Sequence, residues 1–197
     1  MSEIEPGETT IETTLSTCRM ASPLGEILLV SDPRGTALCG LYLERQKYFP
    51  SHADHWREIP DAPIFREAVR QLREFFDGAR TRFDLALAPV GTDFQREVWG
   101  AIAQIPFGET ISYAELARRC GKPSAARAAG AATGRNPITI VIPCHRVVGS
   151  DGALTGYRWG VERKRRLLET EQGAQTPPND GARLRQSALD SAAPDML

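Results

Sequence analysis

The sequence predicts an α+β protein with two parts, a small N-terminal domain of strands and one helix and a helical C-terminal domain. Two β-rich runs with a turn between them lie in residues 24–44, and three short helical patterns separated by turns lie in residues 93–134. The chain has 197 residues, 41% of them hydrophobic and 25% charged. This composition is typical of a globular protein with an apolar core.

The N-terminal α+β domain is expected over residues 21–90, after a polar, acidic tail at residues 1–20 that we expect to be flexible. The runs LGEILLVS and TALCGLYLE are joined by Asp32-Pro33-Arg34-Gly35, which has good turn chemistry, so they predict a hairpin. Apolar residues at helical spacing from Phe65 to Phe76 predict a helix that Gly78 ends. The alternation in residues 83–88 predicts another strand.

The C-terminal domain is expected over residues 91–172, and a second flexible tail over residues 173–197, where Pro, Asn, Asp, Gly and Ser dominate. Asp93 is interpreted as the N-cap of a first helix, and Ser112 as the cap of a second. A glycine-containing turn and a third helix follow, so this region predicts a helix-turn-helix. A helix with a basic face is expected from Val161 to about Glu171.

The net charge of −1 conceals an uneven distribution of charge. Residues 1–91 contain 14 acidic and 10 basic residues, whereas residues 112–136 contain one acidic and five basic residues. A local basic segment favours a confined anionic partner. Because no apolar run approaches the ~20 residues of a membrane helix and the acidic N-terminus lacks the features of a secretory signal, we expect a cytoplasmic protein that does not bind membranes.

The four cysteines, Cys18, Cys39, Cys120 and Cys144, have no paired spacing, so free thiols are expected. Two of them, Cys18 and Cys39, could bind zinc together with His52 and His55, but the spacing matches no compact zinc finger. We therefore expect neither a metal nor a cofactor.

Cys144 follows an apolar run and precedes His145 in the segment PCHRV. A buried cysteine is usually an inert apolar residue. A thiol beside an imidazole, with a carboxylate such as Glu171 further along the chain, nevertheless supplies the parts of an activated nucleophile. A thiol hydrolase would fit these three residues equally well.

The third predicted helix consists almost entirely of Ala and Gly, with Arg127 as its one long side chain. Such a helix cannot read base edges in the major groove, but it allows close backbone approach to the narrow minor groove. Tight packing against another helix is the alternative interpretation. A lone arginine on such a face could fill the space left by an extruded base.

Residues 91–171 closely resemble the O6-alkylguanine-DNA alkyltransferases, or methylated-DNA–protein-cysteine methyltransferases. Five segments match in the family's order and spacing: GTDFQREVW, IPFGETISYAELA, AARAAGAATGRNP, IPCHRVVGSDGALTGYRWG and ERKRRLLETE. Weaker similarity extends back through SPLG and the end of the FFDG helix. The resemblance implies that the N-terminal α/β domain is ribonuclease-H-like and that the C-terminal domain carries the helix-turn-helix.

The resemblance also implies direct-reversal DNA repair. The methyl or other alkyl group of O6-methylguanine, and of O4-methylthymine, in double-stranded DNA would pass to Cys144. The protein would bind as a monomer through the minor groove. Such a displacement needs a thiolate, so we expect a thiol pKa below its usual ~8.5. The thioether product should make the reaction irreversible, so that each molecule reacts once as a suicide enzyme.

The family's residue roles transfer to matching positions of this sequence. Cys144 would accept the methyl group, His145 would act as base through a water, and Glu171 would orient the histidine. Asn136 would be the hinge that ties the third predicted helix, the recognition helix of the family, to the active-site loop before Cys144. Tyr113 would rotate the lesion's phosphate and form a hydrogen bond with the flipped base.

Further matched positions concern DNA and the purine. Arg127 would enter the base stack. The guanine pocket would be lined by Val147, Tyr157 and Arg158, and the other DNA contacts would be Lys122, Gly130, Arg135 and Ser150.

Three positions depart from some members of the family. Thr133 and Thr139 lie in the lid region, and Trp159 stands where others have glycine, which leaves the accepted alkyl size open. Two alternatives remain: a lesion sensor without transfer activity, although such members replace the cysteine, and a simple helix-turn-helix regulator.

Overall fold

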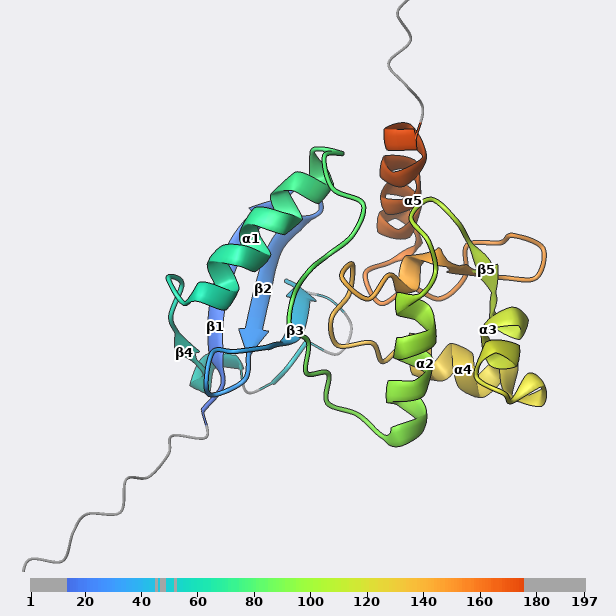
Figure 1. Ribbon diagram of the computed structural model, residues 1–197, viewed down its shortest axis with the longest axis horizontal. Coiled ribbons are helices and arrows are strands. Elements are labelled where there is room, and N and C mark those ends of the chain that lie inside the picture. The colour runs from blue at the N-terminus through green and yellow to red at the C-terminus, as the bar shows by residue number, and fades with distance from the viewer. Residues whose placement is uncertain (1–13, 45, 47–48, 52, 176–197) are drawn as a thin grey trace, which may run out of the picture.

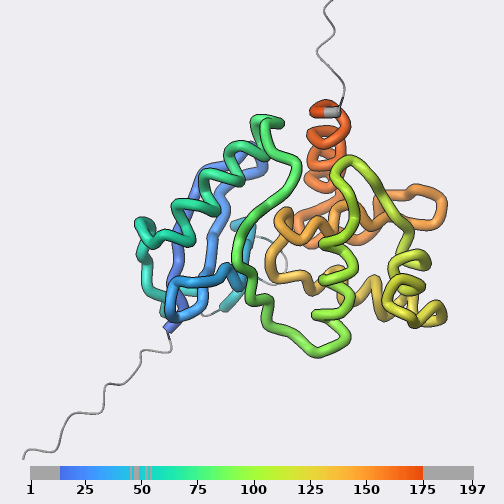
Figure 2. The backbone as a smooth tube through the Cα atoms, in the orientation of Figure 1, coloured from blue at the N-terminus to red at the C-terminus, as the bar shows by residue number. Residues whose placement is uncertain are grey.

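The computed structural model describes residues 14–175 except 45, 47–48 and 52. The N-terminal domain and the C-terminal domain lie side by side, and the segment from residue 77 to residue 92 runs between them (Figures 1 and 2). Of the tails expected at residues 1–20 and 173–197, residues 1–13 and 176–197 lie outside the described residues.

The N-terminal domain is built on a four-stranded sheet in the order β3-β2-β1-β4. Its strands are β1 (Ser16–Ser22), β2 (Gly25–Ser31), β3 (Leu38–Leu43) and β4 (Arg57–Glu58), and a short 3-10 helix, η1, spans Ala53–His55. The central pairs are antiparallel, whereas β4 runs parallel to β1. Helix α1 (Pro63–Phe76) covers one face of the sheet (Figure 1) and buries Phe65, Leu72 and Phe75 against it.

The predicted hairpin is confirmed as β2 and β3. Asp32 closes its turn, because the side-chain Oδ1 accepts hydrogen bonds from the backbone N–H of Thr36 and Ala37 at 2.7 and 3.2 Å. The predicted tail at residues 1–20 is wrong at its end, since β1 begins at Ser16 and pairs with β2 along its whole length. Cys18 and Met20 are buried there, so alternate residues of this polar segment face the core.

The strand predicted at residues 83–88 is not formed as a regular element, and only Leu87 forms an isolated bridge, to Leu38. The Gln71 side chain takes the place of a partner strand beside this segment. Its amide accepts from the Asp84 N–H at 2.8 Å and donates to the Asp84 carbonyl at 2.7 Å. Alternation alone could not reveal that a helix side chain satisfies this backbone.

The C-terminal domain contains the predicted helix-turn-helix. Its elements are α2 (Asp93–Ala103), β5 (Ile111–Ser112), α3 (Tyr113–Arg119), η2 (Pro123–Ala125), α4 (Ala126–Thr133), η3 (Cys144–Arg146), β6 (Val147–Val148) and α5 (Val161–Gln175). The cap of α3 is Ser112, as predicted. The predicted cap Asp93 is wrong by one residue, because Thr92 caps α2. Helix α5 continues three residues into the expected C-terminal tail.

The two domains share one continuous apolar core. The edge strand β3 also meets the C-terminal domain directly, since the Leu41 N–H donates to the Pro137 carbonyl at 2.8 Å. Within the C-terminal domain, Trp99 of α2 donates through Nε1 to the Ala132 carbonyl at 2.9 Å, which packs α4 against α2. No helix in the described part of the chain is long and apolar enough to cross a membrane.

The cap of α2 gives a first prediction. Thr92 Oγ1 accepts from the Gln95 N–H at 3.3 Å, and Gln95 Oε1 accepts from the Thr92 N–H at 3.0 Å. Thr92→Ala should lower the free energy of unfolding by about 1 kcal/mol and the melting temperature by about 2–4 °C. Thr81→Ala, at an exposed threonine without a hydrogen bond among the described residues, should stay within about 0.5 kcal/mol of the parent protein. Equal losses in calorimetry would contradict the capping role.

Candidate functional site

The loop between α4 and Cys144 is held closed by the side chain of Asn136. Its Nδ2 donates to the Ile142 carbonyl at 2.8 Å, and its Oδ1 accepts from the Ile138 N–H at 3.0 Å. Between these contacts Ile140 adopts a φ of 75°, a left-handed conformation that is strained for a β-branched residue. The Asn136 amide therefore ties the end of α4 to the segment immediately before Cys144.

The Cys144 thiol is buried, with 5% of the residue exposed, on the short 3-10 turn η3. Burial raises the pKa of this thiol, while hydrogen bonding with Asn136 and the positive charges of Arg158 and Lys164 oppose the shift. The expectation of a lowered thiol pKa is therefore wrong for the free protein. The resting group is a protonated thiol, which needs a base before it can act as a nucleophile.

His145 and Glu171 form a fully buried pair, with Nε2 of the imidazole 2.6 Å from Oε1 of the carboxylate. Burial lowers the pKa of His145, so the imidazole is neutral near pH 7. Burial by itself would raise the pKa of Glu171, but hydrogen bonds and charges from His145 and Arg146 hold that pKa at about 2. An ionised carboxylate requires the proton on Nε2, and Nδ1 has no hydrogen-bond partner among the described residues.

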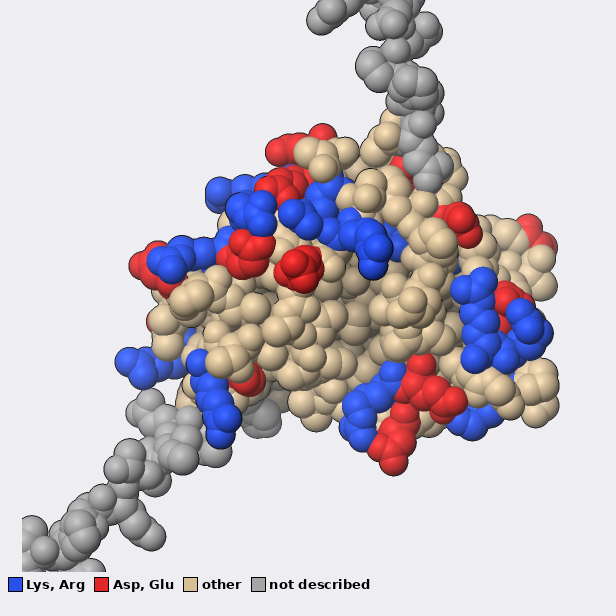
Figure 3. Space-filling view, in the orientation of Figure 1, with Lys and Arg blue, Asp and Glu red and all other residues tan. Residues whose placement is uncertain are grey.

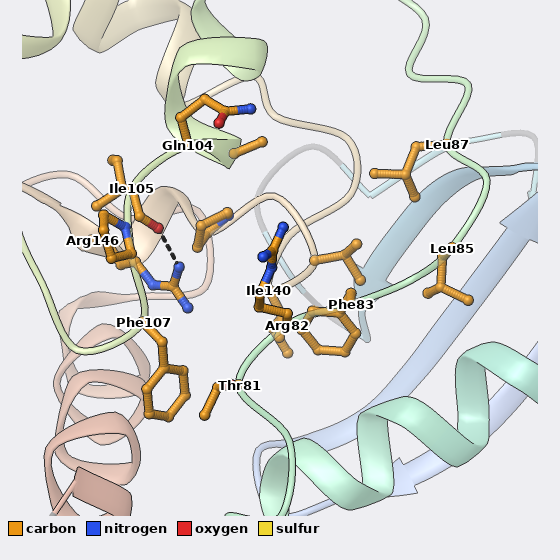
Figure 4. Close-up of a pocket in the computed structure, with 14 residues that line it drawn as sticks. Thr81, Arg82, Phe83, Leu85, Leu87, Gln104, Ile105, Phe107, Ile140 and Arg146 are labelled. Carbon is orange, nitrogen blue, oxygen red and sulfur yellow. Dashed lines mark hydrogen bonds between the residues drawn. The ribbon is translucent and has the colours of Figure 1, made fainter.

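Arg146 completes the binding of the carboxylate, and sequence reasoning did not identify it. Its Nε and Nη2 donate to Glu171 at 2.9–3.1 Å, and its Nη1 donates to the Ile105 carbonyl at 2.6 Å (Figure 4). The Gly108 N–H donates to the second carboxylate oxygen at 2.9 Å. Arg146 also lines a cavity of about 450 Å³ between the domains, but Cys144, His145 and Glu171 do not line it.

Lys164 of α5 is a second buried cation that sequence reasoning missed. Its Nζ donates to the carbonyls of Val147 and Thr155 at 2.6 and 3.1 Å, and burial lowers its pKa. Its charge favours ionisation of the Cys144 thiol. A signal was present in the sequence, because Lys164 and Glu171 share the i, i+3, i+4, i+7 spacing of the buried face with Leu167 and Leu168.

Tyr113 is brought to this loop by pairing between β5 and β6, where Ser112 lies opposite Val148. Its hydroxyl donates to the Thr155 carbonyl at 3.3 Å, and burial raises its pKa. Gly130 of α4 faces the Tyr113 ring, since a Cβ added there would lie 3.5 Å from it. Helix α4 and the start of α3 thus meet at Tyr113, beside the segment that contains Val148 and Thr155.

The three residues predicted to line the guanine pocket adjoin this centre. Val147 follows η3 directly and is buried. The hydroxyl of Tyr157 is buried without a hydrogen-bond partner in the described part of the chain, and Cys144 and Glu171 contribute to raising its pKa after burial itself. The Arg158 guanidinium donates to the Gly134 carbonyl, at the end of α4, at 2.9 and 3.2 Å.

The residues predicted to contact DNA are mostly at the surface. Arg127, Arg135 and Ser150 are exposed. Lys122 is also exposed and forms an ion pair with Glu97 at 2.5 Å, and its Nζ lies 4.8 Å from the centre of the Phe94 ring. On the face drawn in Figure 3, basic and acidic side chains alternate around a broad uncharged area, so this face has no continuous basic surface.

The described residues contain no group of three side chains that could hold a metal ion. The four cysteines are free thiols, as expected, and His52 lies outside the described residues.

Two protein-family models match this chain. The model described as "6-O-methylguanine DNA methyltransferase, DNA binding domain" matches residues 93–173. The model described as "6-O-methylguanine DNA methyltransferase, ribonuclease-like domain" matches residues 17–89. Together they cover most of the chain, and the second agrees with the ribonuclease-like N-terminal domain that the resemblance implied.

Curated relatives and solved structures agree with these matches. Proteins named methylated-DNA–protein-cysteine methyltransferase from Mycobacterium bovis and Methanosarcina barkeri are each 50% identical over 151 residues, covering 77% of this chain and 88% and 93% of theirs. The crystal structure of the Mycobacterium tuberculosis O6-methylguanine methyltransferase is 46% identical, with a TM-score of 0.76, covering 84% of this chain and 97% of that one. The structure of Mycobacterium tuberculosis OGT in complex with DNA is also 46% identical, with a TM-score of 0.75 over 81% of this chain and 94% of that one.

The buried carboxylate predicts a pH dependence of stability. The pKa of Glu171 is about 2 in the folded protein and about 4.3 in an unfolded chain. Because the folded value is the lower one, its stabilising contribution is complete above about pH 4.5 and is lost as the pH falls towards 2. Urea unfolding should show this loss. Glu171→Gln should flatten the dependence of the free energy of unfolding on pH in that window. At pH 7 the substitution should lower the free energy of unfolding by about 3–5 kcal/mol, because Arg146 would keep a buried charge without its carboxylate.

Glu67 provides the matched control. The pKa of its carboxyl is also about 2, through hydrogen bonds from Arg70 and Gln71, but the side chain is 41% exposed. Water screens this interaction, so Glu67→Gln should change the profile much less. An equally flattened profile would show that the buried pair is not responsible.

Proposed function

This chain belongs to the family of the methylated-DNA–protein-cysteine methyltransferases, and we propose that Cys144 is the residue that receives the alkyl group from O6-methylguanine in DNA. One observation carries the proposal: the thiol lies on the same 3-10 turn as His145 and Arg146, whose side chains meet on the buried carboxylate of Glu171. A protonated thiol, followed in the sequence by a neutral, oriented imidazole that can be reached through a water, supplies a nucleophile and its base.

The proposed step is an in-line displacement at the methyl carbon. The bond from the Cys144 sulfur to carbon forms as the bond from carbon to guanine O6 breaks. The thiol proton passes to the imidazole of His145, and Nδ1 is the nitrogen that remains able to accept it, through a water. Glu171 then stabilises the cationic imidazole, as in other buried histidine–carboxylate pairs. Asn136 and Lys164 favour the thiolate that forms transiently.

Negative charge develops on guanine O6 as it leaves, so a hydrogen-bond donor close to the base would assist the reaction. We propose that Tyr113 provides it, with its hydroxyl moving from the Thr155 carbonyl to the base. The departing guanine anion takes up one proton, equivalent to the one that the thiol gave to His145, by way of water. Val147, Tyr157 and Arg158 would line the pocket that receives the purine. O4-methylthymine presents the same kind of alkylated oxygen, and we expect it to be a second substrate.

We propose that the protein binds duplex DNA as a monomer through the minor groove, with α4 against the backbone. The target atom is inside the duplex, so the nucleotide must be flipped out, which costs a few kcal/mol. Arg127 is exposed and has no ion pair among the described residues, which suits it to fill the vacated stack. Gly130, Lys122, Arg135 and Ser150 would contact the DNA, and Lys122 would have to exchange Glu97 for a phosphate. We expect this reaction to take place in the cytoplasm.

The number of lesions removed by each molecule tests the proposal. The product is a thioether, whose carbon–sulfur bond no group of this site can readily break, so each protein should remove one lesion. Quantitative repair of excess O6-methylguanine duplex should stop at one equivalent, and mass spectrometry should find a methyl-sized gain on the peptide containing Cys144.

The matched variant for this experiment is Cys144→Ser, which should bind the duplex yet remove no lesion. Continued turnover by the parent protein, or a methyl group on another residue, would overturn the proposal.

The role of Arg127 is tested by comparing two substrates. Arg127→Ala should slow repair of a well-paired lesion by about tenfold or more, because flipping loses its substitute for the stacked base. The rate with the free nucleobase should hardly change, since nothing has to be flipped. Arg66→Ala, at an exposed arginine of α1, is the control for loss of one positive charge. Equal losses on duplex and free base would contradict the role of a wedge.

A further inference from the structure

Trp159 follows the predicted pocket residues and is buried, with 2% of its surface exposed. Its Nε1 donates at 2.5 Å to Oε1 of Gln46, a residue of the N-terminal domain just after β3. The same oxygen accepts the Leu43 N–H at 2.9 Å, and the Gln46 N–H donates back to the Leu43 carbonyl at 3.1 Å. Gln46 is therefore fixed to the end of β3 while it holds the indole.

The backbone of Trp159 is attached to the same domain. Arg163 of α5 donates through Nη1 to the Trp159 carbonyl at 3.0 Å and through Nε to the Leu24 carbonyl at 3.1 Å. Leu24 lies in the turn between β1 and β2. Both the side chain and the main chain of Trp159 are thus linked to the sheet of the N-terminal domain.

The indole in turn packs against Tyr157, one of the residues proposed to line the purine pocket. The rings of Trp159 and Tyr157 pack edge to face with centres 6.2 Å apart. The Tyr157 hydroxyl is buried and close enough to Cys144 to be influenced by its charge. Arg158, the residue between Tyr157 and Trp159, donates a hydrogen bond to the Gly134 carbonyl and so links this segment to the end of α4. A hydrogen bond and a ring contact therefore join Gln46 through Trp159 to Tyr157.

We propose that Gln46 is a positioning residue for alkyl transfer: by holding Trp159, it fixes the Tyr157 wall and limits the size of the alkyl group that reaches Cys144. This inference rests on the proposed function of Cys144. It gives the N-terminal domain, which supplies none of the reacting groups, a role in substrate selection. Removing the acceptor would leave two buried N–H groups unpaired, so the indole and the wall it supports would be released from this position.

The test compares two duplexes that differ only in the lesion, O6-methylguanine and O6-benzylguanine. In Gln46→Leu, which keeps the volume but loses the acceptor, the ratio of the benzyl to the methyl rate constant should rise at least about fivefold. Trp159→Phe, which lacks the donor, should shift the ratio in the same direction, and the double variant should add little. Gln46→Glu keeps an oxygen acceptor for both N–H groups and should restore the ratio of the parent protein.

Gln71→Leu is the matched control, because Gln71 is another buried glutamine of the N-terminal domain that bonds to backbone groups elsewhere. It should lower the melting temperature without changing the ratio. If Gln46→Leu slows both lesions equally, or changes the ratio no more than Gln71→Leu does, the positioning role is wrong. Failure of the parent protein to methylate Cys144 would instead refute the proposed function itself, so the two failures are distinguishable.

Discussion

The buried carboxylate of Glu171 is the interaction on which the arrangement of the site depends. It binds His145, Arg146 and the Gly108 N–H at once, and so joins α5, the 3-10 turn that bears the thiol and the loop after α2. A charge in this position is tolerated only because the guanidinium of Arg146 and two further donors replace its hydration. The same bonds fix the tautomer of His145. The Glu171 carboxylate therefore both holds these segments together and orients the imidazole.

The protonation state of Cys144 follows from the same burial. A thiol that is protonated at rest is a poor target for oxidants and for stray electrophiles, since both react with the thiolate. In the proposed reaction, ionisation would be coupled to His145 as the base and favoured by the charges of Lys164 and Arg158.

Much of the fold and the family could be predicted from the sequence, because the local helix, cap and turn signals agree with the pattern of apolar residues that the structure buries. Helical spacing located α1, the Ser112 cap located α3, and the order of five motifs identified the family. Strand β1 was not predicted because few large apolar residues alternate with its polar ones. Its pairing with β2 is seen only in the structure. The buried cations Arg146 and Lys164 were missed for a related reason: basic residues are usually exposed, and only the fold shows which carboxylate or carbonyls surround them. The role of Gln46 depends on contacts between domains, which no local pattern contains.

The hydrogen bond from the Leu41 N–H to the Pro137 carbonyl covers an edge of the N-terminal sheet that would be open if the two domains were separated. Strand β3 is one of the two edge strands of its sheet, and the chain covers its open side with residues 86–88 and 137–138. Uncovered strand edges recruit other strands and lead to aggregation. The segment that precedes Cys144 therefore also covers an edge of the N-terminal sheet, so the same few residues place the thiol and occupy a strand edge that could otherwise pair with another chain.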